Sequence, residues 1–234
     1  KEYEGYENIR YEFWSLANDL FVHNYMETIY NWCKEHNCML TGHIMLEESI
    51  FGQMTSSAGI MPFYEYEDIP GIDWLRRRIE SPVIAKQVGS VACQLGKKRV
   101  LTESFGLTGW NISFEEMKWI LEWQYVNGVN MLCQHLQAYS LKGSRKRDYP
   151  PSFFIQQSWW NEFKHFTDYA GRLGYALSCG NQVADVLLLH PMRSGYTCFD
   201  GTRNNAIREL DNKFIEISNV LSGEHISYHY GDET

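Results

Sequence analysis

The stretch RVLTESFGLTGW, residues 99–110, decides how the rest of the chain is interpreted. Its first four residues, 99–102, are typical of a short buried strand, and the carboxylate of Glu103 follows directly. Two glycines and Trp110 come next, in a predicted loop. In α/β domains the carboxyl ends of the strands are where functional groups collect. Glu103 is therefore either a solvated loop residue or part of a functional site, and the surrounding sequence has to distinguish the two.

Predicted helices and strands alternate on both sides of this stretch. On the amino-terminal side, apolar residues at helical spacing predict a helix over 8–36, followed by a short strand at 38–42. On the carboxyl-terminal side, the capping box Ser113–Glu116 predicts a helix that Gly128 ends. The other predicted elements are helices over 81–96, 158–178 and 203–222 and strands over 129–135, 184–191 and 225–230. This alternation indicates an α/β fold with parallel strands joined by crossover helices.

Two places interrupt the alternation. Residues 50–80 are rich in Gly, Met, Tyr and Pro, and they predict an irregular excursion that is too long for an ordinary connection. Near residue 180 a Gly-Asn turn precedes the uninterrupted apolar strand 184–191. We therefore predict two domains, residues 1–180 and 181–234, and expect the strand 184–191 to lie outside the sheet that contains 99–102.

The composition limits the classes of partner and of location. A net charge of −8 argues against nucleic acid, and the basic cluster at 142–147 is expected to be a solvated loop. The absence of an 18-residue apolar run and of a signal peptide predicts no membrane partner. Both the cytoplasm and the bacterial cell envelope stay open. The chain begins with Lys rather than Met, so we expect a processed or truncated piece.

Motifs of several other enzyme classes do not occur in the chain. There is no G-x-S-x-G, P-loop, G-x-G-x-x-G or H-E-x-x-H, which disfavours serine-triad, nucleotide-binding and tight metal sites. The six cysteines form no C-x-x-C pair and are expected to be mostly buried free thiols. The sequence assigns no metal ligand.

Several motifs, in this order, carry a resemblance to a known family. They are TGHIMLEES, PGIDWL, KQVGSVACQLGKKRVLTESFGLTGW, NGVNMLCQH and SWWNEFKHFTDYAGRL, and ADVLLLHP follows them. The first five resemble the later part of the catalytic barrel of α-L-rhamnosidase-type glycoside hydrolases. ADVLLLHP resembles the start of the flavodoxin-like domain that follows such barrels in several glycosidases, β-galactosidases included. The similarity covers roughly residues 8–230.

The resemblance implies a partial (β/α)8 barrel, made of its later strand–helix units, followed by the start of a flavodoxin-like α/β domain. Counted back from residue 180, the strand 129–135 would be the last of the barrel, 99–102 the seventh and 38–42 the sixth. A whole barrel takes about 250 residues, so the front of the barrel would lie outside this chain.

The resemblance also implies a pair of catalytic carboxyl groups, as glycoside hydrolysis requires. Glu103 would be the general base, or the nucleophile if the enzyme retains configuration. Glu47 and Glu48 follow a strand end beside His43, and either is a candidate proton donor or a calcium or hydroxyl ligand. A donor outside this chain is the alternative. No cofactor is assigned, although relatives of this type can use calcium.

Other residues near the predicted strand ends are candidates for substrate binding. His43 and His135 would donate hydrogen bonds to sugar hydroxyls, and we expect both to face the same concavity as Glu103. Trp110 would stack on a sugar ring. Asp148 and Tyr149 are candidates from their position in the last loop.

Taken together, these features predict a fragment of an α-L-rhamnosidase-like glycoside hydrolase that acts on plant or microbial polysaccharide. A β-galactosidase-like retaining glycosidase is the enzyme alternative, and a non-catalytic sugar-binding or structural remnant is the other. The expected partners are a carbohydrate substrate and either the rest of the same polypeptide or a second copy. By itself the fragment is expected to turn over little or nothing.

Overall fold

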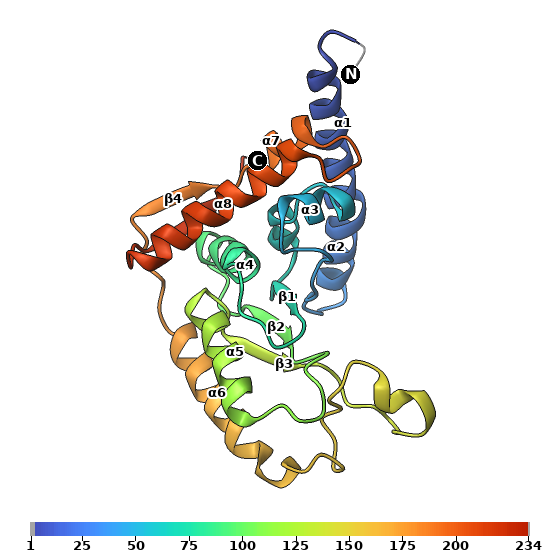
Figure 1. Cartoon of the computed structure of the whole chain (residues 1–234), viewed down its shortest axis with the longest axis vertical. Helices are drawn as coiled ribbons and strands as arrows, with labels where there is room; N and C mark the ends of the chain where they lie inside the picture. The colour runs from blue at the N-terminus through green and yellow to red at the C-terminus, as the bar shows by residue number, and fades with distance from the viewer. Residues whose placement is uncertain (1–2, 234) are drawn as a thin grey trace.

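The computed structural model describes residues 3–233, which fold into helices packed around two small parallel sheets (Figure 1). The helices are α1 (Tyr6–Phe21), α2 (Thr28–Glu35), α3 (Ile50–Ser56), α4 (Val83–Gln94), α5 (Phe114–Val126), α6 (Phe163–Ser178), α7 (Met192–Cys198) and α8 (Asn205–Gly223). The strands are β1 (Gly71–Trp74), β2 (Leu101–Ser104), β3 (Met131–Gln134), β4 (Val186–Leu189) and β5 (Tyr228–Gly231). Short helical turns are η1 (Val22–Glu27), η2 (Met61–Tyr66), η3 (Gly143–Arg147) and η4 (Trp160–Glu162).

The larger sheet contains β1, β2 and β3 in chain order, and all neighbouring strands are parallel. Gly71, Leu101 and Met131 share one register row, so the strand-plus-helix unit repeats after 30 residues. The two crossovers contain α4 and α5, as the alternation in the sequence predicts. This part of the structure is therefore a mixed α/β fold with a parallel sheet.

One strand of this sheet lies where the sequence predicts an irregular excursion. Residues 50–80 contain α3, η2 and β1, and β1 consists of the four residues Gly-Ile-Asp-Trp after Pro70. A segment this short shows too little alternation to identify a strand. The predicted strand at 38–42 is reduced to a single parallel bridge between Thr41 and Ile69. The prediction that 38–42 and 99–102 are neighbours is therefore wrong, because β1 lies between them.

The capped helices agree with the sequence to within about two residues. The predicted helix over 8–36 is continuous from Tyr6 to Glu35, with a π-helical turn, η1, in its middle. At α5 the hydroxyl of Ser113 accepts a hydrogen bond from the Glu116 amide, and the Glu116 carboxylate accepts one from the Ser113 amide. This is the reciprocal capping box that the sequence predicts. No helix in residues 3–233 combines the length and apolarity needed to cross a membrane.

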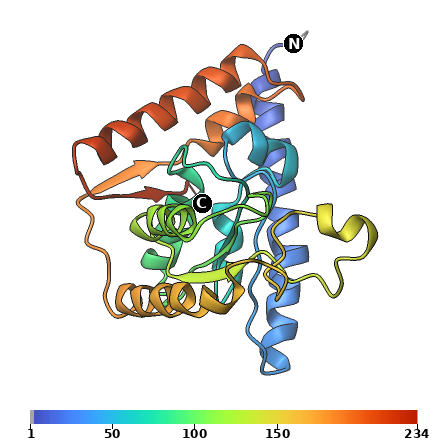
Figure 2. The same ribbon diagram turned by 60° about the horizontal axis from the view of Figure 1, so that its bottom comes forward.

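The second sheet consists of β4 and β5, which pair in parallel and lie side by side beneath α8 (Figure 2). The prediction that 184–191 lies outside the sheet of 99–102 is confirmed. This sheet packs on the outer side of α4, where the Tyr230 amide donates to the Ser90 hydroxyl at 2.9 Å. The boundary near residue 180 itself stays a prediction. The short helix α7 was not predicted.

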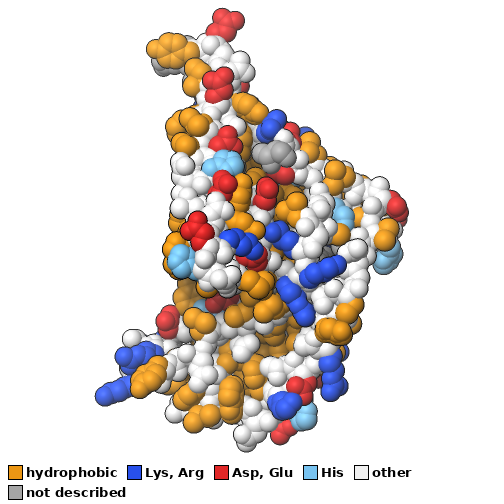
Figure 3. All heavy atoms as spheres, turned by 180° about the vertical axis from the view of Figure 1, so that it is seen from behind, with side chains coloured by type: hydrophobic (Ala, Val, Ile, Leu, Met, Phe, Trp, Pro, Cys, Tyr) orange, Lys and Arg blue, Asp and Glu red, His pale blue; other side chains and the backbone are white. Residues whose placement is uncertain are grey.

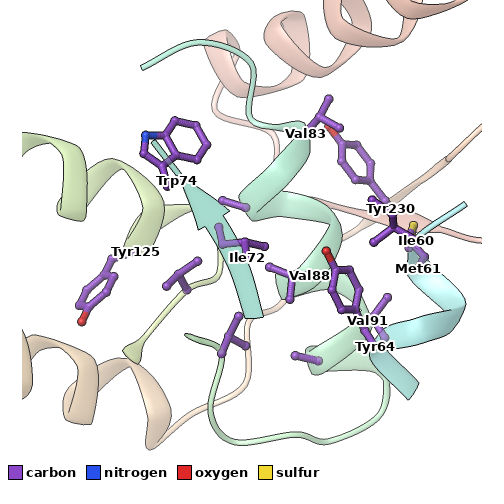
Figure 4. Packing of buried hydrophobic residues seen from close by; sticks show 14 of the residues in the cluster. Ile60, Met61, Tyr64, Ile72, Trp74, Val83, Val88, Val91, Tyr125 and Tyr230 are labelled. Atoms are coloured by element: carbon purple, nitrogen blue, oxygen red, sulfur yellow. The ribbon is translucent and has the colours of Figure 1, made fainter. Parts of the chain in front are cut away.

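The core joins both sheets in one apolar cluster. In Figure 4, Ile72 of β1 and Val88 of α4 lie between Tyr125 of α5 on one side and Tyr230 of β5 on the other. Gly89 lets α4 approach the turn after α5, since a Cβ there would lie 2.8 Å from the Cα of Gly128. The helices thus cover the sheet face that holds Ile72, and the opposite face is left for the candidate site.

Candidate functional site

The candidate site lies on the face of the larger sheet that points away from α5. Thr102 and Ser104 of β2 point toward α5, where both hydroxyls contact the Gln124 side chain. Successive side chains of a strand alternate between faces, so Glu103 points the other way. Asp73, Glu103 and Cys133 form one register row across β1, β2 and β3. The row therefore places the two carboxyl groups side by side on the uncovered face.

His43 is hydrogen-bonded to Glu103. Its Nε2 lies 3.1 Å from Oε2 of Glu103, and its Nδ1 lies 3.3 Å from the carbonyl oxygen of Ile44. Both ring nitrogens therefore face acceptors. The pair is partly accessible, with side-chain exposures of 30% for His43 and 21% for Glu103. A ligand can therefore reach both groups.

Asp73 is a site residue that the sequence analysis missed. Burial raises the pKa of Asp73, and the neighbouring carboxylates of Glu103 and Glu48 raise it further. The imidazoles of His43 and His135 act in the opposite direction. The net effect of these surroundings is a pKa of Asp73 above the usual value of an aspartate. The sequence signal for Asp73 is its place directly after the apolar residue Ile72 in a strand. This strand, β1, has only four residues, which are too few to show the alternation of side chains that identifies a strand.

Glu47 is buried behind the site rather than within it, with 2% of its surface exposed. Its carboxylate accepts hydrogen bonds from the amides of Ile44 and Asp73 at 3.2 and 3.1 Å and from the Tyr64 hydroxyl at 3.2 Å. Burial raises the pKa of Glu47 well above its usual range. The segment after Thr41 turns away from β1, and this carboxylate takes its place at the β1 edge. The geometry favours a role in positioning β1.

Glu48 is exposed at the margin of the site. Its charge raises the pKa of Asp73. It also raises the pKa of Asp211, although burial is the larger cause there. Glu48 as catalytic group stays a prediction.

His135 and Tyr149 lie together on the other side of Glu103. The His135 amide donates to the Ser104 carbonyl at 2.7 Å, which fixes the residue just beyond the end of β3. The rings of His135 and Tyr149 stack with centroids 5.2 Å apart and planes inclined by 13°. Gly106 makes room for this ring, since a Cβ there would lie 3.0 Å from His135. His43 and His135 thus act on Asp73 from different loops.

Trp110 connects the loop after β2 to the loop after β3. Its indole N–H donates to the Lys146 carbonyl at 2.9 Å, and its own carbonyl accepts from Gln157 at 2.8 Å. Asp148 follows η3 and is exposed. Stacking of Trp110 on a sugar ring and contact of Asp148 with substrate stay predictions, while the hydrogen bonds give Trp110 a role in holding η3.

A protein metal site needs several converging side chains of His, Cys, Asp or Glu. No group of three or more such side chains that could hold a metal ion occurs among residues 3–233. A cavity of about 530 Å³ lies at the other end of the sheet, beside Lys97, Val100 and Asn130. Its lining contains no carboxylate and no imidazole. Two carboxyl groups and two imidazoles, the residue types that general acid and base catalysis uses, instead lie together at Asp73, Glu103, His43 and His135.

Comparison with solved structures shows which folds are similar. A rhamnosidase from Novosphingobium sp. PP1Y superposes with a TM-score of 0.65 and 21% identity, over 94% of this chain and 20% of the rhamnosidase. Gan42B, a GH42 β-galactosidase, superposes with a TM-score of 0.59 and 12% identity, over 97% of this chain and 36% of that protein. The chain resembles glycoside hydrolases.

A curated protein of Formosa agariphila, described as "Putative beta-glucuronidase", is 31% identical over 119 residues. The match covers 49% of this chain and 10% of that protein. No family model matches the chain. The chain thus spans about a tenth of the curated relative and between a fifth and two fifths of the two solved structures.

Proposed function

We propose that the chain is part of a glycoside hydrolase whose active site contains Glu103 at the carboxyl end of a barrel strand. The observation that carries this proposal is the row in which Asp73 and Glu103 lie side by side, with His43 hydrogen-bonded to Glu103. Hydrolysis of a glycosidic bond requires two carboxyl groups with different protonation states. The likeness to glycoside hydrolase folds supports the same conclusion.

In this proposal β1, β2 and β3 are the last three strands of a (β/α)8 barrel. The segment at Thr41 would be the strand before them, and the earlier strands would lie in a part of the protein outside these residues. Parallel strands, crossover helices and a polar cluster at the carboxyl ends support this arrangement. Residues 181–234 would begin the flavodoxin-like domain.

The two carboxyl groups take different roles in the proposal. Glu103 is the general base, or the nucleophile if configuration is retained, and the His43 hydrogen bond holds its carboxylate in place. Asp73, with its raised pKa, is the proton donor among residues 3–233. A donor on an earlier strand outside these residues is the alternative. Glu47 positions the Asp73 backbone.

For the sugar we propose an α-L-rhamnoside, because the rhamnosidase gives the higher TM-score of the two reported structures. A β-galactosidase-like retaining enzyme is the second candidate. The test is turnover of three aryl glycosides, the α-L-rhamnoside, the β-D-galactoside and the β-D-glucuronide, by the longest natural polypeptide that contains these residues. Proton NMR of the first product identifies inversion or retention. Turnover of the rhamnoside supports the proposal, and hydrolysis of none of the three contradicts it.

A further inference from the structure

Exposed cations lie on the two loops that follow the neighbours of β2 in the sheet. Arg76 follows β1, and Lys142, Arg145, Lys146 and Arg147 lie in the loop after β3. All five are exposed, and no ion pair in residues 3–233 involves any of them. We call these five residues the basic rim. Figure 3 shows Lys and Arg side chains gathered on the protruding loop at its lower left.

The basic rim is attached to the loop that follows Glu103. The Lys146 carbonyl accepts the Trp110 indole N–H at 2.9 Å, and the Gly109 amide donates to the Pro150 carbonyl at 2.9 Å. On the other side, the Arg76 amide donates to the Gly106 carbonyl at 2.7 Å. These hydrogen bonds attach both loops that carry the cations to the loop after β2.

The local charge is opposite to that of the whole chain. Between residues 136 and 149 the chain carries four cations and one carboxylate, Asp148, whereas the net charge of the chain is −8. Glu116 and Glu80 are paired with the cations that follow Arg76, since Glu116 binds Arg77 at 2.9 Å and Glu80 binds Arg78 at 3.3 Å. A concentration of unpaired cations on an acidic protein is a recognition feature for anions.

We propose that the basic rim binds anionic groups, carboxylates or sulfate esters, on sugar units that flank the bond to be cleaved. The rim lies beside the Asp73–Glu103 row rather than within it, so it would contact the polysaccharide on either side of the reacting sugar. Guanidinium groups fit carboxylate and sulfate oxygens with paired hydrogen bonds. The natural substrate would therefore be an acidic polysaccharide. This inference rests on the proposed function, because it assigns subsites to that same active site.

The test measures binding, which needs no turnover. Affinity electrophoresis of the protein through gels that contain polygalacturonate, dextran sulfate or neutral dextran compares the wild type with the triple variant Arg145→Ala/Lys146→Ala/Arg147→Ala. The control variant Lys98→Ala/Arg172→Ala/Arg208→Ala removes the same charge from exposed positions elsewhere. A single-stranded oligonucleotide serves as a different polyanion.

We expect the wild type and the control variant to bind at least one acidic polysaccharide at low salt. The rim variant should bind about tenfold more weakly, since each exposed ion pair contributes a fraction of the affinity. The polysaccharide that retards the protein identifies the bound anion, which is a carboxylate in polygalacturonate and a sulfate ester in dextran sulfate. Any of three results would overturn the proposal. The first is equally weakened polysaccharide binding in both variants, and the second is equal retardation of the protein by neutral dextran. The third is binding of the oligonucleotide through the rim that is tighter than binding of either acidic polysaccharide.

The two proposals fail separately. A protein that binds an acidic polysaccharide through the rim but hydrolyses no glycoside supports the rim and contradicts the hydrolase. A protein that hydrolyses a neutral aryl rhamnoside but binds neither acidic polysaccharide contradicts the rim alone.

Discussion

At the scale of single residues, the site depends on two carboxyl groups that neighbouring strands place in one row. Asp73 and Glu103 share a register position, and the neighbouring Glu103 carboxylate adds to the rise in the pKa of Asp73 that burial causes. Burial is the main cause of the raised pKa of Asp73, whereas Glu103 is hydrogen-bonded to His43. Unequal surroundings of this kind separate an acid from a base within one site.

The Asp73→Asn variant tests this assignment. If Asp73 protonates the leaving oxygen, the variant should lose about a hundredfold or more in kcat on an aryl glycoside with a poor leaving group. A dinitrophenyl glycoside, whose leaving group needs little protonation, should lose far less. Wild-type activity should fall as the pH rises through the raised pKa of Asp73, because the proton donor is then ionised. The variant should lack this fall in its pH–rate profile. Equal losses on both substrates would place the proton donor elsewhere.

The sequence identified residues of the candidate site only where it also identified the strand that they follow. Glu103 and His43 were identified because each follows or ends a predicted strand, and the structure brings them within 3.1 Å. Asp73 was missed because β1 has only four residues. The catalytic role of Glu47 stays a prediction, and its burial could not be predicted because it depends on contacts with Tyr64 and the β1 edge, which are distant in sequence.

At the scale of elements, the outer edge of β1 is completed by buried carboxylates rather than by a strand. Glu67 is 1% exposed and accepts a hydrogen bond from the Gly71 amide at 3.3 Å. Burial raises the pKa of Glu67 to about 7. A carboxyl group with a raised folded pKa holds its proton more tightly in the folded state, so the free energy of unfolding falls as pH rises from about 4.5 to 7.

The Glu67→Gln variant should remove this pH dependence. Glutamine keeps an oxygen for Gly71 but has no proton to lose. Between pH 4.5 and 8 the variant should gain roughly 3 kcal/mol in free energy of unfolding relative to the wild type. Urea denaturation at both pH values measures the difference. Glu65→Gln, at an exposed neighbour, is the control. A difference that does not change with pH would show that Glu67 ionises freely in the folded state.

Helix α6 packs closely on the start of β3 through Gly174. A Cβ at Gly174 would lie 2.2 Å from the Asn130 carbonyl oxygen, so Gly174→Ala forces the helix outward. We expect a loss of roughly 1–3 kcal/mol in stability. Gly171 lies in the same helix with nothing within 4 Å of its Cβ position, and Gly171→Ala should stabilise by up to about 1 kcal/mol. Thermal unfolding of the pair measures both, and similar shifts would contradict the packing described.

The elements differ in how far the sequence specifies them. α5 was predicted because its capping box and Gly128 mark both ends locally. β2 and β3 were predicted with boundaries that differ from the observed ones by one or two residues, because a strand ends where its neighbours end. The short helices α3 and α7 were missed because each has only seven residues and so little periodicity. Their formation depends on packing against α8, including the Asp211 carboxylate that accepts the Ile50 amide at 2.6 Å.

At the scale of the whole molecule, the two sheets share one apolar core. Tyr230 of β5 belongs to the same cluster as Ile72 of β1, and Gln94 of α4 donates to the Tyr230 carbonyl at 2.9 Å. We therefore expect a single cooperative unfolding transition, with far-UV and near-UV circular dichroism giving the same midpoint. Two separate transitions would mean that residues 181–234 unfold independently and that the shared core contributes little.

The fold class and the separate second sheet could be predicted, since both follow from alternation along the chain. The partners of the outer strands could not, because the edge of β1 depends on contacts that are distant in sequence, such as the bridge between Thr41 and Ile69 and the Glu47 carboxylate. The chain covers 20% of the rhamnosidase and 36% of the β-galactosidase. In our proposal, the 234-residue chain alone would lack the loops of the earlier strands and turn over little or nothing.

The most direct test of the central proposal is the kcat of the Glu103→Gln variant of the longest natural polypeptide that contains these residues. Glutamine keeps the shape and the contact with His43 but cannot accept a proton or attack. We predict at least about a hundredfold loss of kcat on the aryl α-L-rhamnoside, with an unchanged melting temperature. Glu115→Gln, at an exposed position on α5, should keep full activity. A near-wild-type kcat for Glu103→Gln would contradict the account and make Glu103 a structural acid.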